Sequence, residues 1–310
     1  MIKLCVYSQS CRLCRMKKSY TVVLVVVLSL GVLLFARGEL LVLSIMARSL
    51  TPQALEDLSA KIGPAVKVVV PEGHGIGPFP VLIMLHGCGG VRPGDSASWA
   101  AIAADMGYIV ALVDSNGPRG YDWQAAQDTV CDGSVLLGQE RAADVLVGLG
   151  RVLDTQMADP DSVVLLGWSH GAWTAMDFMT MRPDQLPAGV SNYDGPWPNV
   201  TAAVLYYPYC GLGALSRVRG WAAQPSVLAL MGAKDETVDT ALCTSLLEQM
   251  KIDGLPVDMV IYPEANHSFD YIGRDSEKSW FRVDDAADAK MRVIKFLKAE
   301  MELWSQKQGS

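Results

Sequence analysis

The chain has 310 residues, half of them hydrophobic, and a formal net charge of −7 at pH 7. This length allows one large hydrophobic core or two modest ones. Because binding to phosphate backbones requires a basic surface, the acidic balance argues against nucleic acid as a partner.

An apolar run near the N-terminus is the first predicted element. Basic residues lie within the first twenty positions, and residues 21–36 carry no charge. We predict a hydrophobic helix over residues 21–47, which is either a signal peptide cut after the small-x-small sequence of residues 36–38 or an uncleaved membrane anchor. At 1.5 Å per residue the uncharged run reaches about 24 Å, which is short of the roughly 30 Å of a bilayer core. Residues 40–47 could extend it.

The basic flank sets the expected location of the rest of the chain. Positive residues stay on the cytoplasmic side of a membrane. Residues 1–20 are therefore predicted to form a short basic cytoplasmic tail, and the remainder is expected on the periplasmic or extracellular side. A membrane anchor is the preferred interpretation, and secretion after cleavage is the alternative. The start of translation, at Met1 or Met16, stays open.

The positions of the cysteines agree with export. Four of the seven cysteines lie beyond the apolar run, an even number that suits a disulfide framework in an oxidising compartment. The alternative is that they are small buried hydrophobic residues. These four are Cys88, Cys131, Cys210 and Cys243.

From residue 51 onward the sequence alternates strand and helix signals. Continuous apolar runs are typical of strands buried on both faces of a parallel sheet. The alternation predicts one α/β domain over residues 51–310, with a mostly parallel central sheet and helices on both faces. Residues 117–133 and 182–199 are predicted excursions over the top of the sheet. We expect strands at 65–70, 81–87, 108–115, 162–168, 202–209, 226–232 and 257–263, and helices at 98–107, 136–154, 170–181, 240–254 and 287–304.

A predicted strand-to-helix turn at residues 167–171 has the sequence Gly-Trp-Ser-His-Gly, which fits the pattern G-x-S-x-G. This pattern permits a sharp turn in which the Ser is held in a strained conformation. The glycines are needed because side chains there would collide across the turn. Ser169 is therefore a candidate nucleophile, and the alternative is a tight turn without chemistry.

A serine nucleophile requires a base, and the base requires an orienting carboxylate. Ligands of an open α/β sheet lie at the carboxyl ends of its strands. His267 follows the last predicted strand, and Asp235 follows the strand before it. Asp235 also lies between Ser169 and His267 in chain order, which suits this arrangement. Singly, Asp235 fits a helix N-cap and His267 a loop histidine, but their order and positions together predict a Ser-His-Asp triad.

Backbone donors for an oxyanion are expected beside the nucleophile. Residues 86–90, His-Gly-Cys-Gly-Gly, follow a central strand, and their N–H groups can point inward. The predicted oxyanion hole consists of the N–H groups of Cys88 and His170. The alternative is that this loop is only a tight strand-to-helix turn.

Two further side chains are candidate substrate contacts. Arg119 follows the strand at 108–115 and suits an anionic substrate group; the alternative is an ion pair with Asp122 or Asp132. Trp168 flanks the turn and is a candidate wall of the acyl pocket; the alternative is a core position. We predict no metal site.

The segments LHGCGG, DSNGPRG, GWSHGAW, MGAKDETV and EANHSFD, in this order, resemble the dienelactone hydrolase family of α/β-hydrolases. The resemblance extends from about residue 60 to about residue 305. It implies an α/β-hydrolase fold, hydrolysis of an ester or lactone, and no metal or organic cofactor. The best-known members use a Cys nucleophile, whereas this chain has Ser169, which places it nearer the exported esterase-like members.

The resemblance also bears on the disulfides. In this fold the strands that precede Cys88 and Cys131 are neighbours, as are those that precede Cys210 and Cys243. Of the three possible connectivities, 88–131 and 210–243 are therefore favoured.

The predicted function is a serine hydrolase that cleaves an ester or lactone of a small substrate through an acyl-enzyme. A non-catalytic binding protein on the same scaffold is the alternative from another class. An acyltransferase or a peptidase with the same triad is the alternative among enzymes. The physiological substrate and the oligomeric state stay open.

Overall fold

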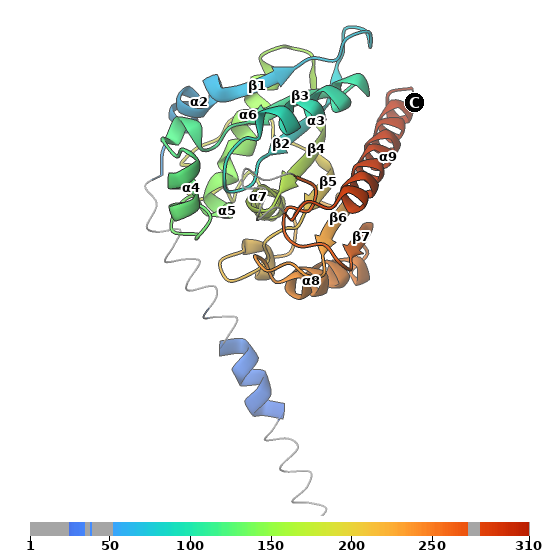
Figure 1. The fold of residues 1–310 in the computed structure, drawn as a ribbon. Helices are drawn as coiled ribbons and strands as arrows, with labels where there is room; N and C mark the ends of the chain where they lie inside the picture. The colour runs from blue at the N-terminus through green and yellow to red at the C-terminus, as the bar shows by residue number, and fades with distance from the viewer. Residues whose placement is uncertain (1–24, 35–37, 39–51, 272–279, 310) are drawn as a thin grey trace, which may run out of the picture. The chain divides into compact units, whose positions relative to one another are not determined.

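The computed structural model describes residues 25–34, 38, 52–271 and 280–309 (Figure 1). The chain divides into two compact units, residues 1–46 and residues 47–310. In the first unit residues 25–34 are helical, and most other positions of the predicted 21–47 helix lie outside the described residues. None of the helices in the described ranges is both long and apolar enough to cross a bilayer.

The second unit is built around a seven-stranded sheet. Its strands are β1 (Val66–Val69), β2 (Phe79–Leu85), β3 (Ile109–Val113), β4 (Ala158–Trp168), β5 (Val200–Tyr206), β6 (Ser226–Gly232) and β7 (Val257–Tyr262). Their order across the sheet is β1-β3-β2-β4-β5-β6-β7. β1 pairs antiparallel with β3, and the other neighbouring pairs of this sheet are parallel. The predicted mostly parallel sheet is therefore confirmed.

The central strands are buried along their length, as their unbroken apolar sequences predict. Every residue of β2 and β3 is buried, whereas the edge strands β1 and β7 leave part of their residues exposed. β4 begins at Ala158, earlier than the predicted start at residue 162. The reason is that Ala158 and Asp159 pair with the first two residues of β2, before a shift in register.

Helices cover both faces of the sheet (Figure 1). They are α2 (Leu55–Ile62), α3 (Pro93–Asp105), α4 (Trp123–Thr129), α5 (Gly138–Arg141), α6 (Ala143–Leu153), α7 (His170–Met179), α8 (Thr240–Ile252) and α9 (Val283–Gln308). Trp99 of α3 and Val293 of α9 share a core with Leu82 of β2. On α6, a Cβ built on Gly148 would lie 3.4 Å from the side chain of Ile83. Successive side chains of a strand point to opposite faces, so Leu82 and Ile83 face the two helical layers.

Besides the earlier starts of α3 and α9, the helices depart from the prediction in three places. The predicted helix at 136–154 is divided into α5 and α6, which are separated by Ala142. The excursion at 117–133 contains a short 3-10 helix (Gly117–Arg119) and α4, whose N-cap Asp122 accepts a hydrogen bond from the N–H of Ala125. α2 was not expected, and it is positioned by burial of its apolar face.

Two disulfides join segments around the carboxyl end of the sheet. Cys88 follows β2 and is bonded to Cys131, just beyond α4, with 5.0 Å between their Cα atoms. Cys210 follows β5 and is bonded to Cys243 in α8, with 5.2 Å between Cα atoms. Both favoured pairings are confirmed.

Candidate active site

Ser169 lies at the junction between β4 and α7, with φ 51° and ψ −114°. A positive φ is uncommon for a residue that carries a side chain. A Cβ on Gly167 would lie 2.6 Å from the backbone N of Ala172. A Cβ on Gly171 would overlap the carbonyl oxygen of Leu85. Because both obstacles are backbone atoms, only glycine at these two positions lets the strand and the helix meet at one residue.

His267 connects Ser169 to Asp235. Its Nε2 lies 2.9 Å from Ser169 Oγ, and its Nδ1 lies 2.8 Å from Asp235 Oδ2. A carboxylate only accepts, so Nδ1 carries the proton and Nε2 is the acceptor for the serine hydroxyl. The Asp235 side chain is fully buried, and the His267 side chain is nearly so. The structure thus brings the three residues predicted from the sequence into one hydrogen-bonded chain.

The backbone holds the Asp235 carboxylate in place. Its Oδ1 accepts hydrogen bonds from the N–H groups of Thr237 and Val238, at 2.8 and 2.9 Å. The helix-cap role that Asp235 also suited belongs instead to Asp239, which is the N-cap of α8. Asp235 is therefore free to direct its second oxygen toward the histidine.

The loop after β2, residues 86–90, passes directly over the nucleophile, and we call it the oxyanion loop. A Cβ on Gly87 would lie 3.8 Å from Ser169 Cβ. Within the part of the chain that the structure describes, the N–H of Cys88 has no hydrogen-bond partner. His170 is the first residue of α7, where N–H groups have no partner inside the helix. Both predicted donors are therefore available to a substrate oxygen.

Arg119 differs from its predicted role as a substrate contact. Its two terminal nitrogens donate to both carboxylate oxygens of Asp144 at 2.8 Å, and one of them also donates to the carbonyl of Ser115. Asp144 on α6 is fully buried, and a buried carboxylate requires such a partner. The ion-pair alternative is therefore the one observed, with Asp144 in place of Asp122 or Asp132.

Trp168 occupies the core alternative rather than the wall of an open pocket. Its indole is buried and stacked on Tyr206, with ring centroids 5.6 Å apart. The indole N–H donates to Asp270 Oδ2 at 3.0 Å, and the other oxygen of Asp270 accepts from the Tyr207 hydroxyl at 2.7 Å. The Tyr207 ring packs on His267, with centroids 4.6 Å apart. Asp270 thereby links the segment after β7, which carries His267, to the turn that carries Ser169.

The sequence did not reveal the polar groups beneath the oxyanion loop. His86, Ser115 and Arg141 are all buried and hydrogen-bonded to one another. Arg141 lies in the predicted helix at 136–154, and an arginine of a helix is expected on its solvent face. One sequence feature could have indicated this cluster: His86 and Ser115 follow the ends of two strands, β2 and β3, that are neighbours in the sheet.

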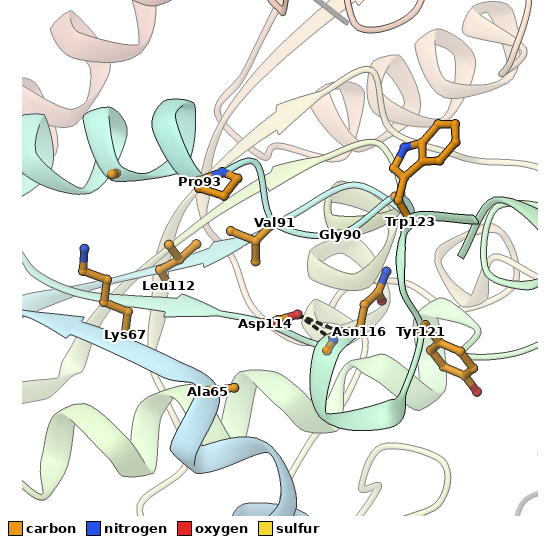
Figure 2. Close-up of a pocket in the computed structure, with 13 residues that line it drawn as sticks. Ala65, Lys67, Gly90, Val91, Pro93, Leu112, Asp114, Asn116, Tyr121 and Trp123 are labelled. Atoms are coloured by element: carbon orange, nitrogen blue, oxygen red, sulfur yellow. Dashed lines mark hydrogen bonds between the residues drawn. The ribbon is translucent and has the colours of Figure 1, made fainter. Parts of the chain in front are cut away.

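A cavity of about 470 Å³ borders the oxyanion loop. Figure 2 shows Lys67 and Leu112 on adjacent strands, Pro93 at the start of α3, and Tyr121 and Trp123 on the segment after β3. The backbone of loop glycines 89 and 90 contributes to the same wall. The cavity therefore borders the oxyanion loop at these two glycines, and Ser169, His267, Cys88 and His170 are not among the residues that line it.

Across residues 52–271 and 280–309, no group of three or more His, Cys, Asp or Glu side chains is placed to hold a metal ion. Asp235 is engaged by His267, and Asp144 is engaged by Arg119.

Solved structures share this fold at low sequence identity. A putative dienelactone hydrolase from Klebsiella pneumoniae is 18% identical, with a TM-score of 0.55 over 75% of this chain and 91% of that one. A dienelactone hydrolase-like promiscuous phosphotriesterase from metagenomic libraries is 16% identical, with a TM-score of 0.57 over 76% and 91%. Thermogutta terrifontis esterase 2, phosphorylated by paraoxon, is 16% identical, with a TM-score of 0.55 over 74% and 88%.

Curated relatives are longer proteins. The acylamino-acid-releasing enzyme of Sus scrofa is 24% identical over 227 residues, which is 64% of this chain and 30% of the relative. Dipeptidyl peptidase 8 of Homo sapiens is 26% identical over 183 residues, which is 53% of this chain and 19% of the relative. The chain thus spans at most 30% of the length of these two relatives.

The family comparison covers most of the second unit. Residues 65–301 match the dienelactone hydrolase family. This range includes the whole sheet from β1 to β7, the oxyanion loop, and the hydrogen-bonded chain of Ser169, His267 and Asp235. The chain belongs to the dienelactone hydrolase family.

Proposed function

We propose that this protein is a serine hydrolase that cleaves a carboxylic ester or lactone of a small substrate through an acyl-enzyme. The observation that carries the proposal is the chain of hydrogen bonds from Ser169 through His267 to Asp235, at 2.9 and 2.8 Å. A binding protein on this scaffold would have no need for a base and a carboxylate aligned on a serine. The esterase among the structural relatives is in agreement with this reaction.

In the proposed mechanism, Ser169 Oγ attacks the substrate carbonyl while His267 Nε2 takes the hydroxyl proton. Asp235 keeps the proton on His267 Nδ1 and stabilises the imidazolium that forms. The tetrahedral oxyanion accepts hydrogen bonds from the N–H groups of Cys88 and His170. When the intermediate collapses, the leaving alcohol takes the proton from His267. Water then hydrolyses the acyl-enzyme by the same steps.

The cavity beside the oxyanion loop supports a small substrate. Its volume of about 470 Å³ falls in the range of small-molecule pockets, roughly 300–1,000 Å³. The lining combines the apolar side chains of Val91, Pro93 and Leu112 with the ring of Tyr121. Such a surface suits an aliphatic or single-ring group of the substrate that lies away from the ester bond, because none of the triad residues lines the cavity.

A covalent probe and two variants test the proposal. An alkyl phosphonofluoridate is expected to label Ser169 in the wild-type protein and to stop the hydrolysis of p-nitrophenyl acetate and butyrate. Ser169→Ala and His267→Ala are each expected to lower kcat by about 10⁴-fold, because the nucleophile or its base is lost. Labelling is read by mass spectrometry of the Ser169 peptide. His74→Ala, an exposed histidine bonded only to the Asp105 carbonyl, is the control and is expected to keep full activity.

Other results would contradict the assignment. Ester hydrolysis by Ser169→Ala at the wild-type rate would remove this site from the reaction. A wild-type protein that takes no probe and cleaves no ester would favour the binding-protein alternative.

A peptidase is the second candidate, because the curated relatives include acylamino-acid-releasing enzymes and dipeptidyl peptidases. The same triad can cleave amides when the leaving amine is protonated. A matched pair, N-acetylalanine p-nitrophenyl ester and N-acetylalanine p-nitroanilide, separates the two. We expect ester kcat/KM to exceed amide kcat/KM by at least about 10³-fold; a ratio below about tenfold would assign peptidase activity.

A further inference from the structure

Arg141 is a fully buried cation that lies beneath the predicted oxyanion hole. Its Nη1 donates to the carbonyl of His86 at 2.8 Å and to Nδ1 of His170 at 3.0 Å. Its Nε donates to Ser115 Oγ at 2.8 Å. One guanidinium therefore contacts the first residue of the oxyanion loop and the residue that directly follows the nucleophile.

This guanidinium has no carboxylate partner within the part of the chain that the structure describes. Asp144, three residues further along the chain, has both oxygens engaged by Arg119. Burial lowers the pKa of Arg141 to about 10, so the group stays protonated at neutral pH. Buried charges are normally paired, because their desolvation is costly. The positive charge of Arg141 thus lies directly under the site without an ion-pair partner of its own among the described residues, and the more distant carboxylates of Asp144 and Asp114 favour its charged form.

His86 connects Arg141 to the first predicted donor of the oxyanion hole, the N–H of Cys88. Its Nε2 accepts a hydrogen bond from the N–H of Ser115 at 3.0 Å, and its Nδ1 donates to the carbonyl of Gly87 at 2.6 Å. Burial and then the charge of Arg141 hold the pKa of His86 well below its usual range, so the ring is neutral, and its 3.8 Å approach to Asp114 is not an ion pair. The Gly87 carbonyl belongs to the peptide unit whose N–H is that of Cys88. Hydrogen bonding at the carbonyl polarises the N–H of the same peptide.

We propose that Arg141 is a positioning residue that holds both donors of the oxyanion hole and favours the negative charge that develops there. On one side it fixes the His86 carbonyl and so the start of the oxyanion loop. On the other side it holds the ring of His170, and the backbone N–H of this same residue is the second donor. This inference rests on the proposed serine-hydrolase function, because the oxyanion exists only during acyl transfer.

The test compares transition-state binding with ground-state binding. Arg141→Met is expected to lower kcat for p-nitrophenyl butyrate by about 10- to 100-fold while KM changes by less than about threefold, since removing one oxyanion donor outright costs about 10²–10³-fold. Affinity for a trifluoromethyl ketone, which forms a charged tetrahedral adduct with the serine, is expected to fall by the same factor. Affinity for the product butyrate stays unchanged. Arg141→Lys keeps the charge and is expected to recover part of both losses.

Leu149→Ala is the matched control for lost stability. Leu149 lies on α6 and is as fully buried as Arg141, and its truncation is expected to lower stability by several degrees in Tm with no change in kcat. A merely structural Arg141 would behave like this control, and that result would overturn the inference.

Ser115→Ala covers the case in which Arg141→Met does not fold. It removes only the acceptor of Nε and is expected to lower kcat and ketone affinity together by about three- to tenfold. If Ser115→Ala lowers Tm but leaves kcat unchanged, the inference fails. Phosphonate labelling of wild-type Ser169 separates this failure from that of the proposed function, because the wild-type result does not depend on Arg141 variants.

Discussion

Asp177 on α7 is a carboxyl group that has no contact with solvent. Its Oδ1 accepts hydrogen bonds from the N–H and hydroxyl of Ser216, whereas Oδ2 has no hydrogen-bond partner among the residues that the structure describes. Burial raises the pKa of Asp177 from 3.8 to about 7. Between these two pH values the folded chain keeps a proton that the unfolded chain releases, so stability falls as pH rises from about 4 to about 7.

Replacing Asp177 by Asn should remove this pH dependence. Asn cannot ionise and can still accept from Ser216. If Asp177→Asn matches the wild type at pH 5, we expect it to exceed the wild type at pH 8 by about 3 kcal/mol, or roughly 6 °C in Tm, measured by thermal unfolding. Asp184→Asn on the surface is the control, with the same difference at both pH values. A wild-type advantage at pH 8 would contradict the assignment.

At the level of single residues, the sequence was sufficient to predict those site residues that follow strand ends in a characteristic chain order. Ser169, Asp235 and His267 meet because each follows a strand of a parallel sheet. The ion-pair partner of Arg119 was not predicted, because Asp144 lies on a separate helix and burial rather than proximity in sequence selected it. The position of Arg141 beneath the site was not predicted, because it depends on contacts with His86 and Ser115, which follow two different strands.

At the level of elements, the disulfide Cys88–Cys131 attaches the oxyanion loop to the segment after α4. Replacing both cysteines by Ala is expected to lower kcat by about tenfold with little change in KM, because the loop loses a fixed position for the Cys88 N–H. Activity on p-nitrophenyl butyrate and Tm are measured together.

The second disulfide provides the comparison. Cys210 and Cys243 are separated by 33 residues, against 43 for the first pair, so loop closure contributes similarly to stability in both. Replacing both by Ala is expected to lower Tm to a comparable extent while kcat stays within twofold. Equal kcat losses in the two double variants would show that Cys88–Cys131 has no special relation to the site.

Element types were predictable from apolar runs, but their limits were not. The strands buried on both faces have sequences that read as continuous hydrophobic segments. The start of β4 depends on pairing with the first residues of β2, a long-range contact. The interruption between α5 and α6 at Ala142 has no signal in the apolar pattern of the sequence.

At the level of the whole molecule, we propose that the hydrolase unit operates outside the cytoplasm. Two disulfides in the chain suit an oxidising compartment, and the basic flank before residues 21–36 suits insertion with the N-terminus inside. The full chain with a C-terminal tag is expected to be digested by protease added to intact spheroplasts. Release of the unit by detergent indicates an anchor, and release by osmotic shock indicates cleavage.

Two charges placed in the apolar run provide the control. Val27→Asp with Leu30→Asp is expected to block export and to leave the tag protected, because each charge costs several kcal/mol within a bilayer. Protection of the wild-type tag would contradict export.

The backbone contacts of Gly167 and Gly171 have a consequence for anyone who wishes to redirect this protein. The turn forms because Gly167 and Gly171 have no side chains, and the hydroxyl of Ser169 is not needed for the path of the chain. A library that seeks new reactions can therefore replace the hydroxyl at position 169 by small side chains that tolerate the positive φ of 51°, and can vary the exposed walls of the cavity. Positions 167 and 171 should stay constant, because any side chain there would disrupt the scaffold before it altered selectivity.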